Sequence, residues 1–382
     1  MRNGCSAEAD TVATIAAGAP VTIRYALAGE ATPCYKVVVE QNGKAVEGYL
    51  SAAEIAGIDQ FEQQRREAAM VNSTPAAKDL MPRMPAIAAN TGIALEASRL
   101  IADSQPAKAL QLLEPELIKQ HDANLLAIAG YAAWRADEGR RALEYWRSSL
   151  DLDPNPDLER SYRRLEREVR ADRSTEKLIG LRVTLRYDSA AVPAETARQM
   201  LAALDQEFIR ISGALGCAPE ERIAAIVQTR EAYRKSTDVE EWNAGQFDGR
   251  IRVPVVSGQA MDASMRRIFA HETTHACLSL LGSWPAWLHE GLAQKFSGDA
   301  VTPSARQKIA TLVKEHRIPR LENLGQDWSR LDAEHAAAAY AISLAAVDLF
   351  FEEYAQLGIV NLLHNPDRLA AIAADLDKRL GL

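Results

Sequence analysis

The sequence predicts a multidomain protein with a small N-terminal β domain, a helical segment and a C-terminal α+β domain. A chain of 382 residues is longer than one ordinary hydrophobic core accommodates. Turn-separated β-branched runs come first, helix-spaced small and apolar residues follow, and strand patterns precede helices in the last half. We expect the β domain at 10–58, a helix and proline-containing linker at 59–91, the helical segment at 92–175 and the α+β domain at 178–382.

The composition predicts a soluble globular protein, because 47% of the residues are hydrophobic and 25% are charged. The 44 basic and 52 acidic residues give a formal net charge of −8, which argues against a surface for nucleic acid or anionic membranes. No uninterrupted apolar run reaches transmembrane length. We therefore expect neither a nucleic-acid partner nor a membrane span.

Strand and turn residues alternate from Pro20 to Leu50, in PVTIRYALAGEATPCYKVVVEQNGKAVEGYL. The dipeptide Asn42-Gly43 is typical of a two-residue β-hairpin turn. The segment resembles a bacterial SH3-like barrel, and the alternative is a β-hairpin subdomain without that kinship. Residues 58–70 are expected to be helical, and the prolines that follow them exclude one long helix and indicate a linker.

The helical segment contains two stretches that align with each other, ALQLLEPELIKQHDAN from Ala109 and ALEYWRSSLDLDPNP from Ala142. Antiparallel helices need small residues at their crossing and a large one to fill the groove. The segment resembles a tetratricopeptide repeat, which places small, aromatic and terminating residues at the positions of Gly130, Tyr131, Ala142, Tyr145 and Pro154. We interpret it as a helical spacer, with a peptide-binding groove as the alternative. The charged stretch from Leu158, LERSYRRLEREVRADR, predicts a solvent-exposed closing helix.

The last half of the chain begins with strand and helix patterns. LRVTLRYD, RIAAIVQ and FDGRIRVPVV are predicted strands, and ETARQMLAALDQEFIRISGALG is a predicted amphipathic helix between the first two. The chain after Ala260 is expected to be helical almost throughout. Pro254 favours an edge position for the third strand.

Two histidines in HETTH, His271 and His275, are four residues apart. On a helix they lie one turn apart and about 40° from each other, so both imidazoles can reach one ion. Glu272 points in a neighbouring direction, where it can hold a water without binding the ion itself. Helix formation is favoured because Pro and Gly are absent from 265–281.

A catalytic zinc ion requires three protein ligands and one open position. Gly282-Ser283 predicts a turn, Ser283 is a candidate cap, and Pro285 suits the first turn of a second helix, PAWLHEGLAQKF. An antiparallel return brings Glu290 back over the two imidazoles as the third ligand. Gly291 and Ala293 allow the close approach of backbones that such a crossing needs.

HETTH followed by WLHEGLA resembles the gluzincin clan of zinc metallopeptidases, and in particular the bacterial peptidase MA-like proteins. The resemblance covers roughly the last half of the chain and implies His271, His275 and Glu290 as zinc ligands. His289 is a rival third ligand. Adjacent helical positions differ by about 100°, so only one of the two neighbours faces the ion, and the position of Glu in WLHEGLA favours Glu290.

The expected reaction is peptide-bond hydrolysis by a zinc-bound water that Glu272 activates as general base. Related peptidases carry a tyrosine on a later helix, so Tyr340 is a candidate to stabilise the oxyanion, with a plain core aromatic as the alternative and His335 as an outside candidate. Gln294 is either a partner of a ligand histidine or a surface amide. The resemblance also implies an edge strand that pairs with the substrate backbone, and Arg250 and Arg252 on it either contact an acidic substrate or are solvated.

Two rival functions stay open. In one, the chain is an interaction scaffold whose helical repeat binds a protein partner while the zinc domain is idle. In the other, a zinc site hydrolyses an amide that is not a peptide. Cys5 and Cys34 are candidates for a disulfide, which together with the resemblance favours the periplasm or cell envelope, whereas we interpret Cys217 and Cys277 as packing residues rather than nucleophiles.

Overall fold

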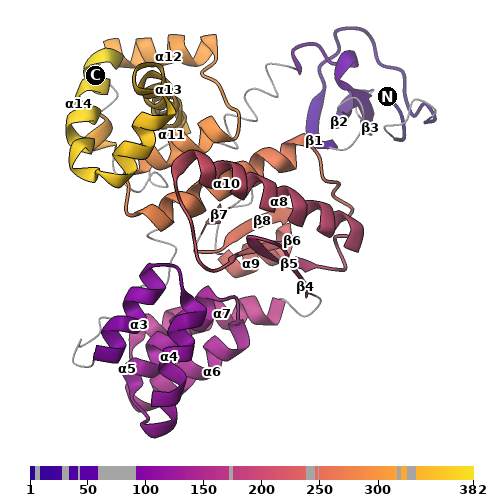
Figure 1. The fold of residues 1–382 in the computed structure, drawn as a ribbon. Coiled ribbons are helices and arrows are strands. Elements are labelled where there is room, and N and C mark those ends of the chain that lie inside the picture. Colours follow the sequence, from indigo (N-terminus) through magenta and orange to yellow (C-terminus); the bar gives the residue numbers. More distant parts are fainter. Residues whose placement is uncertain are drawn as a thin grey trace.

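The computed structural model of the chain describes residues 1–4, 9–27, 34–41, 44–58, 92–171, 175–237, 246–247, 249–315, 320–324 and 333–382. They form a small antiparallel sheet near the N-terminus, a helical middle, and a C-terminal region of helices and a mixed sheet. Figure 1 shows these three groups of elements, with the N-terminus beside the small sheet and the C-terminus in the last helix. This order of β and α parts agrees with the sequence prediction.

The N-terminal sheet is antiparallel and has the strand order β1-β2-β3. Its strands are β1 (Thr22–Leu27), β2 (Cys34–Gln41) and β3 (Lys44–Ser51). Alternate side chains of β2 enter a small core, which is what one buried face of a sheet requires. The β-branched and aromatic runs between turn residues therefore predicted these strands correctly.

Several predictions for this end of the chain fall outside the described residues. They concern the Asn42-Gly43 turn, the 59–91 linker and Cys5. The strands on either side of the turn pair up to Gln41 and Lys44, as a two-residue connection requires. Cys34, the proposed partner of Cys5, is disulfide-bonded.

The helical middle consists of α3 (Gly92–Ala102), α4 (Pro106–Lys119), α5 (Ala123–Arg135), α6 (Gly139–Leu152) and α7 (Pro156–Ala171). α5 and α6 cross closely at Gly130, where an added Cβ would lie 2.2 Å from the Trp146 ring. Trp146 Nε1 donates to the carbonyl of Ala127 at 3.1 Å. The predicted small residue at the crossing is confirmed, but the large side chain that fills the groove is Trp146 rather than Tyr145.

The composition of helix α7 predicts a solvent-exposed helix, but only one face of it is exposed. Exposed ion pairs such as Arg163 with Glu159 follow its outer face. Glu168, on another face, is only 3% exposed. α7 packs against α9 (Arg230–Thr237), so the helical middle contacts the C-terminal region along this helix.

The C-terminal region is built on a mixed sheet whose order, in the described residues, is β4-β5-β6-β8-β7. The strands are β4 (Thr175–Ile179), β5 (Val183–Asp188), β6 (Ile223–Thr229), β7 (Gln246–Phe247) and β8 (Ile251–Val255). β5, β6 and β8 are parallel, while β4 and β7 join antiparallel at the two sides. Helix α8 (Ala194–Leu215) connects β5 to β6, as a parallel pair requires.

Three elements of this region, β4, β7 and α9, are missing from the sequence prediction. The predicted strand LRVTLRYD begins only at Val183, because the preceding residues form a turn that α8 caps. Asp205 of α8 accepts hydrogen bonds from the backbone N–H groups of Leu181, Arg182 and Val183 at 2.7, 2.8 and 2.9 Å. The expected boundary at 178 therefore falls inside β4.

Strand β8 is not a full edge strand. It lies between β6 and β7, and β7 pairs only with Ile251 and Arg252. Pro254 pairs with Gln228 of β6 on the other side. Within the described residues, 253–255 have no strand on their outer side, so the prediction of an edge position holds there. A proline at such a position interrupts no hydrogen bond to an outer strand.

Both predictions for Arg250 and Arg252 are wrong, since neither side chain is solvated or open to a substrate. Each is 0% exposed, and each donates to Glu168 of α7, at 3.1 Å from Arg250 and 2.7 Å from Arg252. Arg186 of β5 donates to the same carboxylate at 3.0 Å. Charges on a strand are usually exposed, but here a neighbouring helix covers them.

The register explains how one glutamate contacts several arginines. Arg186 and Arg252 lie opposite the same β6 residue, Ile226, so they form a row across one face of the sheet. Asp137, in the turn between α5 and α6, accepts from Arg186 Nε at 3.1 Å. We use the name interface ion cluster for five residues, Asp137, Glu168, Arg186, Arg250 and Arg252. It fastens the helical middle to the sheet.

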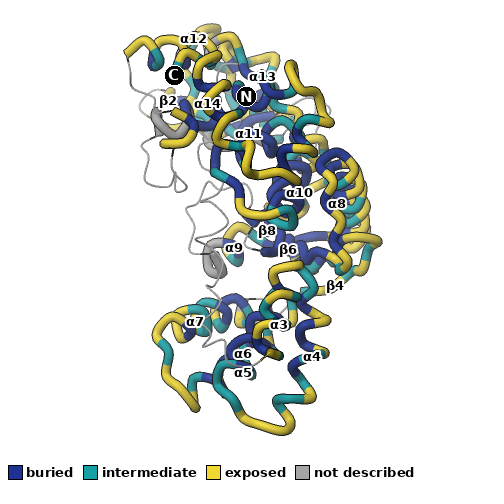
Figure 2. The backbone as a smooth tube through the Cα atoms, turned by 60° about the vertical axis from the view of Figure 1, so that its left-hand side comes forward, coloured by how far each residue is buried: buried dark blue, intermediate teal, exposed yellow. Residues whose placement is uncertain are grey.

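The remaining chain is helical in its described residues, as the sequence predicts. The helices are α10 (Ala263–Leu281), α11 (Ala286–Phe296), α12 (Pro303–Lys314), α13 (Ala333–His364), which is interrupted at Ala355, and α14 (Leu369–Leu380). α8 and α10 cover the sheet face opposite the helical middle (Figure 1). In Figure 2, many of the buried residues lie along β6, β8 and α10.

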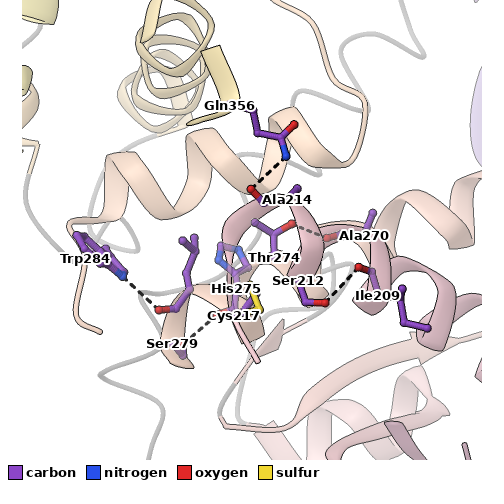
Figure 3. Close-up of a disulfide and its surroundings, with 12 residues drawn as sticks. Ile209, Ser212, Ala214, Cys217, Ala270, Thr274, His275, Ser279, Trp284 and Gln356 are labelled. Carbon is purple, nitrogen blue, oxygen red and sulfur yellow. Dashed lines mark hydrogen bonds between the residues drawn. A yellow bond between two sulfur atoms is a disulfide. The ribbon is translucent and has the colours of Figure 1, made fainter. Parts of the chain in front are cut away.

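Cys217 and Cys277 are packed in the core, as the sequence predicts, but the sequence did not indicate that they pair with each other. They form a disulfide with a Cα–Cα distance of 5.6 Å, and both are buried. The bond joins the end of α8 to α10 at a point two residues beyond His275 (Figure 3). Within the described residues, none of the helices combines the length and the apolar character that a membrane span needs.

Candidate metal centre

Helix α10 supplies the two histidines of HETTH. Asp262 caps its first turn by accepting from the Met265 N–H at 2.8 Å, and the helix continues unbroken to Leu281. His271 and His275 therefore lie one turn apart, with their Nε2 atoms 3.1 Å from each other. Both rings are buried, so their nitrogens are directed toward a shared point with little competition from solvent.

Helix α11 supplies the carboxylate. Gly282, with φ of 142°, ends α10, and α11 begins at Ala286. Ser283 does not cap it: Pro285 occupies the cap position, and no side-chain cap hydrogen bond forms there. The return still brings Glu290 to the imidazoles, with Oε2 3.6 Å from His271 Nε2 and Oε1 3.6 Å from His275 Nε2.

Gly291 allows a close helix crossing, but not the predicted one. An added Cβ would lie 2.4 Å from the backbone oxygen of Ser343 and 2.7 Å from Val347 Cγ2, both in α13. The close approach is thus between α11 and α13, on a side of α11 about 100° from the one that Glu290 presents to the histidines. α13 holds α11, and α11 holds Glu290 against α10.

Two buried carboxyl groups of this site have an oxygen without a hydrogen-bond partner in the described residues, namely Oε2 of Glu272 and Oε2 of Glu290. Burial raises the pKa of Glu272 to about 8, and the charge of Glu290 adds to this effect. Burial also raises the pKa of Glu290, against the opposing effect of His271. Unpaired buried polar atoms are rare, and a bound ion or water molecule is one explanation for them.

The two imidazoles differ in their electrostatic surroundings. Burial lowers the pKa of His275 well below its ordinary value, and the charges of His271 and His289 act in the same direction. Burial also acts to lower the pKa of His271, but the neighbouring Glu290 outweighs it, so the pKa is raised. Asp299, which the sequence did not single out, contributes to that increase.

The donor atoms have the spacing that a tetrahedral metal ion requires. Metal–nitrogen and metal–oxygen bonds of about 2.0–2.2 Å separate tetrahedral donor atoms by roughly 3.3–3.5 Å. The observed separations are 3.1 Å between the imidazole nitrogens and 3.6 Å from each nitrogen to the carboxylate. The three side chains therefore fit one ion with small movements.

Among the described residues, these three form the one group of His, Cys, Asp and Glu side chains within reach of a single ion. Comparisons with protein-family models, curated proteins and solved structures found no match. Two imidazoles and a carboxylate suit several divalent transition metals, zinc among them. The site is thus a candidate metal centre, which the sequence predicted by residue number.

His289, the rival third ligand, lies on another side of His275. Its Nδ1 atom is 3.3 Å from Nδ1 of His275, and the two rings are stacked with centroids 5.5 Å apart. The nitrogens of His275 that face His289 and the carboxylate are therefore different ones. Glu290, and not His289, shares the convergence point of the imidazoles.

Both predictions for Gln294 are wrong. Its side chain is buried, and Nε2 donates to the carbonyl of Glu290 at 3.1 Å and to that of Tyr340 at 3.0 Å. Gln294 thus fastens α11 to α13 rather than to a histidine. Tyr340 is buried on α13, and its catalytic role stays a prediction, while the side chain of His335 lies outside the described residues.

Proposed function

We propose that the chain is a zinc-dependent peptidase in which His271, His275 and Glu290 bind the ion. The observation that carries the proposal is the buried convergence of these three side chains beside a fourth, Glu272, whose Oε2 has no hydrogen-bond partner in the described residues. A structural metal site has no need of a buried general base. The pair HETTH and WLHEGLA favours zinc among the metals that suit this donor set.

When bound, zinc supplies Lewis acidity, which lowers the pKa of a coordinated water toward about 7 and stabilises negative charge on a carbonyl oxygen. Glu272 accepts a proton from the attacking water and returns it to the leaving amine. In the metal-free chain burial raises the pKa of Glu272, and the positive charge of a bound ion would act in the opposite direction and favour the carboxylate form that a base needs. Peptide hydrolysis then needs no covalent intermediate with the protein.

Tyr340 is our candidate for a second group that stabilises the oxyanion. Its support is the position on α13, which packs against α11 and is tied to it through Gln294. A tyrosine hydroxyl can donate to a developing oxyanion. A Tyr340→Phe variant tests this role. Unchanged turnover would show that Tyr340 is a core aromatic without a part in catalysis.

The finer fold assignments are part of the same proposal. The mixed sheet with α10 and α11 supports a gluzincin-type domain, the Gly130 crossing supports a tetratricopeptide-like unit, and the N-terminal sheet supports an SH3-like unit. The buried disulfide between Cys217 and Cys277 supports an oxidising compartment such as the periplasm or cell envelope.

The test combines metal analysis with cleavage of a diverse peptide pool, using Glu272→Gln as the matched control. We expect about one equivalent of zinc in both proteins, and a roughly 10²–10⁴-fold lower cleavage rate in the variant. Less than roughly a tenth of an equivalent after purification with zinc present would contradict the ligand assignment. Full zinc content without peptide cleavage would favour another amide substrate or an idle zinc domain in a scaffold.

A further inference from the structure

We infer that His289 is a positioning residue for the metal ligand His275. In this arrangement Nδ1 of His289 accepts the hydrogen on Nδ1 of His275, which fixes the tautomer and the orientation of that ring. The inference rests on the proposed function, because it assigns His289 a role in holding the zinc ligand. It makes no use of His289 as a ligand or as an acid.

The geometry places different neighbours on the two nitrogens of His275. Nε2 faces the metal centre, 3.1 Å from His271 Nε2 and 3.6 Å from Glu290 Oε1. Nδ1 faces away from it, 3.3 Å from Nδ1 of His289. The ring planes of His275 and His289 are inclined by 29°, and their centroids are 5.5 Å apart.

Metal binding determines where the hydrogen of His275 must be. A neutral imidazole carries one N–H, and a ligand that binds through the Nε2 lone pair carries it on Nδ1. That buried N–H needs an acceptor, because an unsatisfied buried donor is costly. Neutral His289 with its own hydrogen on Nε2 offers the Nδ1 lone pair to it. Metal-ligating histidines almost always have such a partner on the second nitrogen.

One helix provides both the ligand and the acceptor. His289 and Glu290 are adjacent in α11 and differ by about 100° around its axis, so they approach His275 from two sides. Trp287 and Leu288 are buried in the core directly before them, which fixes α11 in place. The ring of His275 is therefore oriented at both nitrogens by a single rigid element.

The first experiment compares His289→Leu with His289→Asn. Leucine has no acceptor, whereas the Oδ1 of asparagine occupies a position close to that of Nδ1 in histidine. We expect the dissociation constant for zinc, measured by competition with a chromogenic chelator, to rise roughly 10–100-fold in His289→Leu and to recover most of the way in His289→Asn. His121→Leu, at an exposed histidine outside the centre, is the control and should bind zinc like the wild type.

The second experiment uses the wild-type protein, so it does not depend on the folding of a variant. Long-range ¹H–¹⁵N spectra of the histidine rings distinguish protonated, unprotonated and metal-bound nitrogens. With zinc bound, we expect a hydrogen on Nδ1 of His275 and none on Nδ1 of His289. A hydrogen on Nδ1 of His289, or a metal-bound Nδ1 in His275, would overturn the inference.

Failure of this inference can be separated from failure of the proposed function by His271→Ala. If His271→Ala loses zinc while His289→Leu binds it as tightly as the wild type, His289 is not a positioning residue and the centre stands. If His271→Ala also keeps wild-type affinity for zinc, the proposed metal centre itself is wrong, and the inference fails with it.

Discussion

The molecule contains two buried groups of charged side chains, and they are satisfied in opposite ways. In the interface ion cluster, the carboxylate of Glu168 receives hydrogen bonds from Arg186, Arg250 and Arg252. In the candidate metal centre, Glu290 lies 3.6 Å from each of two imidazole nitrogens and has an oxygen without a hydrogen-bond partner in the described residues. Burial is similar in both groups, since each glutamate is 3% exposed.

For this reason the pKa of Glu168 is lowered from its ordinary value, whereas that of Glu290 is raised. Burial alone would raise the pKa of Glu168, but the charges of the surrounding arginines hold it well below the ordinary range. Burial raises the pKa of Glu290, and His271 only partly compensates. A buried carboxylate that the protein neutralises is a structural group, whereas one that it leaves short of positive charge can bind a cation.

The largest expected effect comes from removing the charge of Glu290 while keeping its shape. Glu290→Gln should weaken zinc binding by more than the roughly 100-fold that loss of an outer partner can cause, because a ligand is replaced. The metal-free variant should be at least as stable as the metal-free wild type, since a poorly compensated buried acid has been removed. Zinc titration and urea unfolding in the presence of a chelator measure the two quantities. Zinc binding that survives in Glu290→Gln but is lost in His289→Ala would show that the ligand was misassigned.

The same substitution in the interface ion cluster should have the opposite effect on stability. Glu168→Gln leaves Arg250 and Arg252 buried without their carboxylate, which should lower the free energy of unfolding by about 3–5 kcal/mol. Glu159→Gln, at an exposed ion pair on the same helix, is the control and should change it by less than about 1 kcal/mol. Urea unfolding, followed by the fluorescence of the tryptophans, measures both. Equal effects of Glu168→Gln and Glu159→Gln on the free energy of unfolding would contradict a structural role of the buried ion pairs.

The effect of Glu168 should also depend on pH in a defined direction. Its pKa in the folded protein lies below the ordinary value of 4.5, so its contribution to stability is complete above about that pH. The contribution is lost as the pH falls from 4.5 toward the lowered value. The stability difference between wild type and Glu168→Gln should therefore be largest near neutral pH and shrink in acid. A difference that grows as the pH falls would contradict the structural role of the ion pairs.

The disulfide is the next largest contribution, and it holds α10, the helix that carries His271 and His275. Cys217 and Cys277 are 60 residues apart in sequence, so their bond restricts the unfolded chain and ties α10 to the end of α8. Replacing both by serine should lower the free energy of unfolding by roughly 2–4 kcal/mol. Reductant should lower the free energy of unfolding of the wild type. It should lower that of the double variant by less, because the Cys217–Cys277 bond is already absent. An unchanged stability of the double variant would refute the contribution.

The metal centre was predictable from the sequence because it depends on local geometry. A spacing of four residues places His271 and His275 on one helical face, and a short turn after Leu281 forces the next helix to return beside them. The strands of the parallel sheet were also predictable from their apolar periodicity. Helical geometry lets only one of the adjacent residues His289 and Glu290 face the histidines, and the resemblance of WLHEGLA to the gluzincin motif favoured Glu290.

The interface ion cluster and the disulfide could not be predicted in this way, since both join segments that are distant in sequence. Arg250 and Arg252 have the alternation of solvated charges, and only the position of α7 shows that Glu168 covers them. Cys277 has the pattern of an apolar helical residue whether or not Cys217 lies opposite. Gln294 resembles a surface amide until α13 is placed beside it. In each case the deciding partner comes from the tertiary fold.

The smallest predicted effect tests whether the metal centre depends on the packing of α13 against α11. Gly291→Ala would force α11 away from α13, because the new Cβ would lie 2.4 Å from the backbone oxygen of Ser343. We expect a loss of about 1–3 kcal/mol in the free energy of unfolding, together with weaker zinc binding, since Glu290 moves with α11. Gly213→Ala in α8 is the matched control: nothing lies within 4 Å of its added Cβ, so it should stabilise the protein by about 0.5–1 kcal/mol. If Gly291→Ala is as well tolerated as Gly213→Ala, α13 does not hold the ligand helix in place.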